Sequence, residues 1–101
     1  MLRYFQMWNT GETRAVADLV GDALAYHARP ETTDAESLAE VIRASRAADQ
    51  SLHVFVDAVL EGGKLVNVVG RVRSTTDDIE RIRNRVWVFR VDERIREIWR
   101  Y

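Results

Sequence analysis

The fold is decided by residues 52–73, which read LHVFVDAVLEGGKLVNVVGRVR. Residues 52–60 and 64–73 are rich in β-branched and aromatic side chains, which are enriched in strands. Gly62-Gly63 stands between them, and such pairs are typical of two-residue hairpin turns because these turns need positive φ angles. The stretch therefore predicts two antiparallel strands, with a bulge or bend at Gly70, since glycine inside a strand often marks one.

The residues that follow predict more strands. Residues 85–91, RVWVFRV, and 95–101, IREIWRY, predict a second hairpin across Asp92-Glu93-Arg94. Residues 74–84, STTDDIERIRN, are polar, and we expect a loop or one helical turn there. The sheet should therefore hold at least four antiparallel strands and bend strongly.

Helical periodicity precedes the strands. Apolar residues at three-residue spacing predict a helix over residues 2–8, and a second short helix is expected at 16–20, before a strand at 23–27. Thr33 and Glu36 match a capping box, and apolar residues at i, i+3, i+4 and i+7 predict a helix over 35–48. Three helices followed by an antiparallel sheet are typical of the α+β class.

The bulk composition sets limits on organisation and partners. The chain has 101 residues, which fits one domain over 1–101. It has no cysteine, which excludes disulfides, thiolate metal sites and cysteine nucleophiles. A net charge of −1 argues against nucleic acid as a partner, and no apolar run is long enough for a membrane span. We expect a cytoplasmic protein.

Charge and histidine placement add two further expectations. Residues 71–101 hold nine arginines, which we interpret as outward strand positions and a solvated loop. The two histidines lie 26 positions apart without a nearby carboxylate pattern, and no phosphate-binding glycine-rich loop is present. We therefore expect neither a metal nor a cofactor.

Four motifs occur in an order that resembles the SnoaL-like polyketide cyclase family of the nuclear transport factor 2-like superfamily. They are Phe5-Gln6-Met7-Trp8-Asn9-Thr10-Gly11-Glu12, Asp22-Ala23-Leu24-Ala25-Tyr26-His27, Phe89-Arg90-Val91-Asp92, and Ile95 with Glu97 and Trp99. The resemblance spans nearly the whole chain. It implies a cone-shaped fold, in which N-terminal helices pack on a strongly curved antiparallel sheet around a pocket.

The resemblance leaves two functions open. One is an enzyme of the cyclase, isomerase or lyase type that moves a proton next to a carbonyl of a polyketide-like substrate. The other is a non-catalytic module for ligand binding or dimerisation. Trp87 favours the module, because cyclases of the family place a catalytic aspartate two positions before the Phe of the Phe-Arg-Val strand, and Trp87 stands there in this chain.

His27 is the candidate catalytic residue, because imidazole is an acid and a base near neutral pH. If period-2 alternation puts Ala23, Ala25 and His27 on the pocket face, His27 lies in the cavity beside Trp8 and Trp87; the opposite register turns Tyr26 inward. A small hydrophobic or aromatic molecule is the expected ligand. The candidate residues for binding it are Phe5, Trp8, Tyr26, His53, Trp87 and Trp99.

The open face of the sheet predicts a homodimer. A curved sheet with helices on one side leaves its other face uncovered, and exposed apolar patches are usually interfaces. We expect that face to carry Val86, Val88, Ile98, Arg90 and Arg100.

Overall fold

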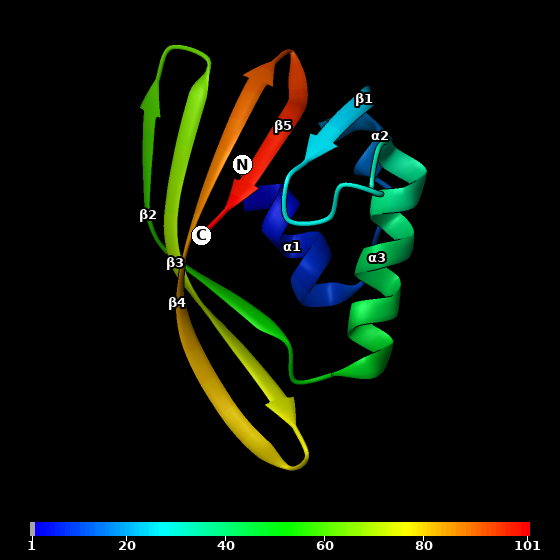
Figure 1. Cartoon of the computed structure of the whole chain (residues 1–101), viewed down its shortest axis with the longest axis vertical. Coiled ribbons are helices and arrows are strands. Elements are labelled where there is room, and N and C mark those ends of the chain that lie inside the picture. The colour runs from blue at the N-terminus through cyan, green and yellow to red at the C-terminus, as the bar shows by residue number, and fades with distance from the viewer. Residues whose placement is uncertain (1) are drawn as a thin grey trace.

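Helices cover one side of a five-stranded sheet in the computed structural model, which describes residues 2–101 (Figure 1). The helices are α1 (Leu2–Thr10), α2 (Val16–Leu19) and α3 (Ala35–Ala48). The strands are β1 (Val20–Tyr26), β2 (His53–Gly62), β3 (Leu65–Thr76), β4 (Ile79–Asp92) and β5 (Arg94–Arg100). None of the described helices is long and apolar enough to cross a membrane.

The strands lie side by side in the order β1-β5-β4-β3-β2. Neighbours from β5 to β2 are antiparallel, and β1 at the edge runs parallel to β5. The α+β class, the three helices and the curved sheet are confirmed. Elements predicted from periodicity match closely, since the helix over 35–48 has the bounds of α3.

The loop expected at residues 74–84 is wrong, because β3 and β4 run through it as one long hairpin. Thr76 pairs with Ile79, and only Asp77 and Asp78 lie between the two strands. Both aspartates have positive φ, 52° and 62°, which is the geometry of a type I′ turn and is tolerated by aspartate. The polarity of this segment reflects strand residues that project beyond the helix layer (Figure 1).

One hairpin turn and one helix cap lie one residue away from their predicted positions. Gly62 pairs with Leu65 as the last residue of β2, so the hairpin turn is Gly63-Lys64, and Gly63 carries the positive φ of 60°. The capping box uses Asp34 and Ser37, and the prediction of Thr33 and Glu36 is wrong. The Asp34 carboxylate accepts from the Ser37 backbone N–H at 2.8 Å, because Asp34 directly precedes the first helical residue.

The core lies between the helices and the inner face of the sheet. α1 contributes Tyr4 and Phe5, whose rings pack edge-to-face on Phe89 and Trp87 of β4 at centroid distances of 4.9–5.8 Å. Such pairs contribute roughly 0.5–1.5 kcal/mol each beyond area burial. The fully buried members of the core also include Leu38, Ile42, Val68 and Ile98.

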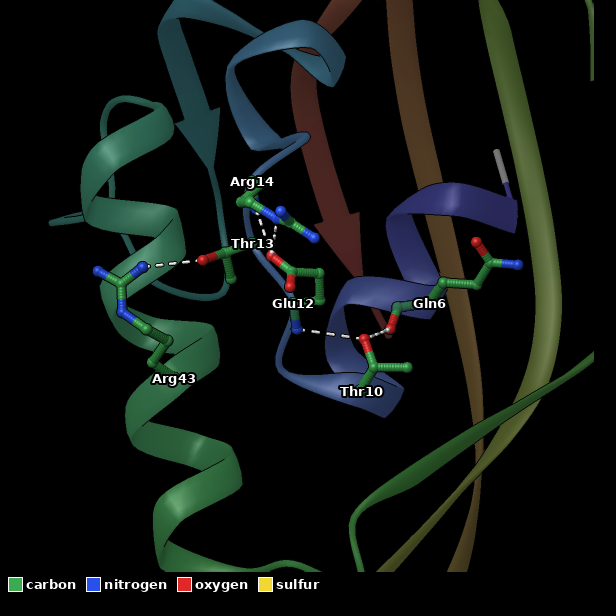
Figure 2. A network of polar contacts seen from close by, with 6 residues as sticks. All are labelled: Gln6, Thr10, Glu12, Thr13, Arg14 and Arg43. Atoms are coloured by element: carbon green, nitrogen blue, oxygen red, sulfur yellow. Dashed lines mark hydrogen bonds and ion pairs between the residues drawn. The ribbon is translucent and has the colours of Figure 1, made fainter.

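Polar contacts fix the position of α1. Asn9 bonds both backbone groups of Val54 on edge strand β2, donating from Nδ2 at 3.0 Å and accepting at Oδ1 at 2.6 Å. Figure 2 shows the link from the segment after α1 to α3, in which the Arg43 guanidinium donates to the Thr13 hydroxyl at 2.8 Å. These bonds hold the C-terminal end of α1 to β2 and the segment that follows it to α3.

Gly70 is required by a close approach. The bulge lies in β2, where Asp57 is the extra residue next to the Val56–Gly70 pair. A Cβ on Gly70 would overlap the carbonyl oxygen of Phe55 and lie 3.2 Å from the Trp87 ring. The expected irregularity is therefore present, but on the neighbouring strand.

The outer face of the sheet carries apolar side chains on adjacent strands. Val69 pairs with Val86, and Val88 pairs with Trp99, so these four side chains share the face that the helices leave open. Val88 and Arg90 lie there as expected, as does Val86. The outer-face placement expected for Ile98 and Arg100 is wrong. Ile98 pairs with Phe89 and Arg100 with Trp87, which places both side chains on the inner face.

Gly70→Ala should destabilise the fold by roughly 1–3 kcal/mol, because the added methyl group forces backbone or ring movement. Urea unfolding measures the loss. Gly62→Ala is the matched control, since a Cβ there meets nothing within 4 Å. A Gly70→Ala variant as stable as Gly62→Ala would contradict the close-approach argument.

Homodimerisation through the outer face stays a prediction. Val69 and Val86 are 40% and 37% exposed, and Leu60 and Leu65 extend the same patch across β2 and β3. Val69→Arg should convert a dimer into a monomer in size-exclusion chromatography with light scattering. Leu2→Arg, on an exposed position of α1, is the control. A wild-type monomer at tens of micromolar would rule the dimer out.

Candidate functional site

A cavity of about 440 Å³ lies between α1 and the inner face of the β3–β4 hairpin. Its walls come from α1, the end of β1, the start of β2 and the end of β5. The rest of the wall is formed by the parts of β3 and β4 nearest the Asp77-Asp78 turn. The lining residues are Phe5, Trp8, Tyr26, Leu52, Val54, Val72, Ser74, Thr76, Asp77, Ile79, Arg81, Arg83, Arg85, Trp87 and Arg100. One end of this lining is apolar, and the other is charged.

The apolar end follows from the aromatic packing of α1. Phe5 and Trp87 are buried and in contact, and Trp8 and Tyr26 lie on the same wall. Trp87 is 4% exposed, so the position that the family resemblance links to a catalytic aspartate is part of the cavity wall. Flat aromatic surfaces of this kind suit an apolar ligand.

A buried hydroxyl lies behind this wall. The Tyr4 side chain is 1% exposed, and its hydroxyl has no hydrogen-bond partner within residues 2–101. Burial raises the pKa of Tyr4 well above its ordinary value; Tyr26 raises it further, whereas the Trp8 side chain and the charge of Arg100 lower it. Tyr4 is therefore a neutral hydrogen-bond donor next to three residues of the cavity wall.

The charged end is a row of arginines on β4. Arg81, Arg83 and Arg85 alternate along the strand and point to the cavity face, and Arg100 joins them from β5. Within the described chain, none of these four guanidinium groups is ion-paired with a carboxylate. The expectation that the arginines of residues 71–101 lie only outward or in a loop is wrong for these four.

His27 lies outside the cavity, so its predicted place beside Trp8 and Trp87 is wrong. Strand β1 buries Leu24 and Tyr26, and alternation then turns Ala25 and His27 to the opposite side. The His27 ring stacks on Trp99 at 4.9 Å, and its Nε2 lies 2.7 Å from Glu97 Oε2. Acid–base chemistry by His27 stays a prediction, and it now concerns a side chain 47% exposed.

Glu97 joins His27 to Arg90 on the outer face. Arg90 Nε donates to the second carboxylate oxygen, Oε1, at 2.9 Å. The hydrogen bonds from His27 and then from Arg90 lower the pKa of Glu97. The three residues form a charged group on the surface where Trp99 and Val88 lie.

The remaining candidates divide between the two faces. Phe5, Trp8, Tyr26 and Trp87 line the cavity, whereas His53 and Trp99 do not, and ligand binding by the four stays a prediction. His53 packs beside Phe55 on the outer face, with centroids 4.6 Å apart. Within residues 2–101, no three side chains of the metal-binding types are grouped closely enough to hold an ion.

Sequence reasoning missed the arginine row, although a signal for it was present. Residues 81–89 read RIRNRVWVF, in which arginine and aromatic residues occupy every second position. This alternation is typical of a strand and places the arginines on the face of Trp87 and Phe89. The interpretation of 74–84 as a loop hid it, because a loop assigns no face to its side chains.

Comparisons with known proteins agree on the architecture. TsrD from Streptomyces laurentii superposes with a TM-score of 0.85 at 13% identity, over 100% of this chain and 83% of its own. A SnoaL-like polyketide cyclase from Agrobacterium tumefaciens gives 0.82 at 13%, over 99% and 85%. IdmH from Streptomyces antibioticus gives 0.78 at 20%, over 96% and 84%.

The fold is the nuclear transport factor 2-like fold. It is the fold that the motif resemblance implied. No protein-family model matches the chain, and no curated protein matches its sequence. At these identities the likeness shows the fold alone, so function has to be argued from the cavity.

His27→Ala should leave ligand binding in the cavity unchanged, because the side chain lies on the other face of the sheet. It should lower stability by less than about 1 kcal/mol, as expected for a half-exposed position. It should also raise the pKa of Glu97 toward its ordinary value, since the strongest lowering contact is removed. NMR titration of the Glu97 carboxyl carbon measures the shift, and an unshifted pKa would contradict the pairing.

Proposed function

We propose that the protein binds a small, flat, predominantly apolar molecule in the cavity between α1 and the β3–β4 hairpin. One observation supports this most directly: four aromatic side chains, Phe5, Trp8, Tyr26 and Trp87, line a cavity of about 440 Å³. A volume of this size lies within the range of small-molecule sites. The polyketide cyclase among the structural neighbours supports an aromatic, polyketide-like compound as the ligand.

The cavity favours binding over acid–base catalysis. Its lining contains no histidine, and its single carboxylate, Asp77, lies in the turn at the tip of the hairpin. Trp87 lies eight residues along β4 from Ile79, the first residue after this turn, which is up to roughly 26 Å at 3.3 Å per residue. A carboxylate so placed cannot remove a proton from a ligand held against the aromatic wall.

A proton-transfer enzyme of the cyclase, isomerase or lyase type is the second candidate. Two donors favour it, since Tyr26 and Arg100 line the cavity beside Trp87 and suit a carbonyl oxygen that becomes negative in an enolate, while solvent accepts the carbon-bound proton. The deciding measurement is deuterium exchange next to the carbonyl of 2-tetralone. An enzyme that uses these donors loses exchange in Tyr26→Phe and keeps it in His27→Ala.

The binding proposal is tested with N-phenyl-1-naphthylamine, a neutral aromatic dye whose fluorescence rises in apolar sites. Wild-type protein should bind it, and Ser74→Trp should weaken binding at least tenfold, because Ser74 lies on the cavity face of β3 and an indole there fills the space. Fluorescence titration measures both affinities.

Asn84→Trp is the matched control. Asn84 pairs with Arg71 and lies on the outer face of the same hairpin, so an equal bulk is added without entering the cavity. Equal dye binding by the two tryptophan variants would contradict a ligand site in this cavity.

A further inference from the structure

Two outer-face arginines and the inner-face row differ in their partners, while a further outer-face arginine, Arg73, donates to the Ser51 carbonyl at 3.2 Å and has no carboxylate partner among residues 2–101. On the outer face, Arg71 binds both oxygens of Asp57 at 3.0 and 3.1 Å, and Arg90 binds Glu97. On the inner face, Arg81, Arg83 and Arg85 have cross-strand partners of a different kind, namely Ser74, Val72 and Gly70. The chain supplies carboxylates to the first set and none to the second.

The unpaired row concentrates positive charge. Alternate residues of a strand lie about 6.6 Å apart, so three guanidinium groups repel one another along one edge of the cavity. Arg100 adds a fourth charge, and the lining offers only Asp77 against them. Guanidinium groups recognise carboxylate and phosphate oxygens by paired hydrogen bonds, so a ligand anion would relieve this repulsion.

The row is continuous with the apolar wall. Arg85 is followed two positions later by Trp87 on the same face, and the Arg100 backbone is registered opposite Trp87. The hydroxyls of Ser74 and Thr76 lie along the same stretch of the cavity and add hydrogen-bond donors. An apolar body against Phe5 and Trp87 would therefore place a polar end among the arginines.

We propose that the ligand is an amphipathic anion, an aromatic or polycyclic body that ends in an oxyanion group, and that the row of Arg81, Arg83 and Arg85 binds this group. The inference rests on the proposed function for the apolar half of the ligand. It adds the chemical class of the other half, and with it the orientation of the ligand, whose anionic end points toward the hairpin tip.

The test compares two dyes that differ by one group. 8-Anilino-1-naphthalenesulfonate is N-phenyl-1-naphthylamine with an added sulfonate. The sulfonate dye should bind at least tenfold more tightly to wild-type protein, and 0.5 M salt should remove most of that advantage, as expected for charge–charge binding. Ser74→Trp should abolish the binding of both dyes, which locates them in the cavity.

The double substitution Arg81→Gln/Arg83→Gln should weaken binding of the sulfonate dye at least tenfold. It should change the affinity for the neutral dye by less than twofold. Arg3→Gln/Arg94→Gln removes the same charge from exposed positions outside the cavity lining and should change neither. Circular dichroism checks that the variants fold. In competition, 2-naphthoate and 2-naphthyl phosphate should displace the sulfonate dye at lower concentration than neutral 2-naphthol.

The outcomes separate the two proposals. Equal binding of both dyes, unaffected by the arginine substitutions, overturns the anion site and leaves the apolar site standing. Arginine-dependent binding of the sulfonate dye without any binding of the neutral dye supports the anion site and overturns the apolar one. Aggregation of the arginine variants with unchanged dye affinity assigns the row to protection of residues 79–85 of β4, which extend past the end of β5, and also overturns the inference.

Discussion

The packing of α1 on strand β4 is the contact on which the rest of the structure depends. Tyr4 and Phe5 meet Trp87 and Phe89 edge-to-face, and these rings fill the space between the helix layer and the middle of the sheet. The same contact fixes where the helix stops. Asn9 at its end binds the backbone of β2 at Val54, so α1 is held across three strands and covers the upper part of the inner face.

The cavity is a consequence of that placement. β3 and β4 continue to the Asp77-Asp78 turn, well beyond the residues that α1 covers (Figure 1). The inner face of this extension has no helix to pack against, and apart from Val72 and Ile79 its side chains in the cavity lining are polar or charged. A pocket results in which buried aromatic rings pass directly into exposed arginines, so one concave surface offers both apolar contact and positive charge.

The two faces of the sheet differ in whether their arginines are paired with carboxylates. On the outer face Arg71 is paired with Asp57 and Arg90 with Glu97, and apolar side chains such as Val69 and Val86 lie among these pairs. Paired charges and a flat apolar patch suit contact with another protein surface. The inner face keeps its arginines unpaired, which suits a small ligand that brings its own charge.

The sequence by itself determined the elements and their class. Periodicity placed α3 and the apolar strands, because burial of one face imposes a spacing that local reading detects. The sequence also named Phe5, Trp8 and Trp87 as candidate wall residues, but it named Trp99 and His53 with them, and these two lie outside the cavity lining. Only the tertiary structure decided which face each strand turned inward. A one-residue change of register reverses every side chain, and for this reason His27 moved to the outer surface, Tyr26 to the cavity, and a segment read as a loop became the strand that carries the arginines.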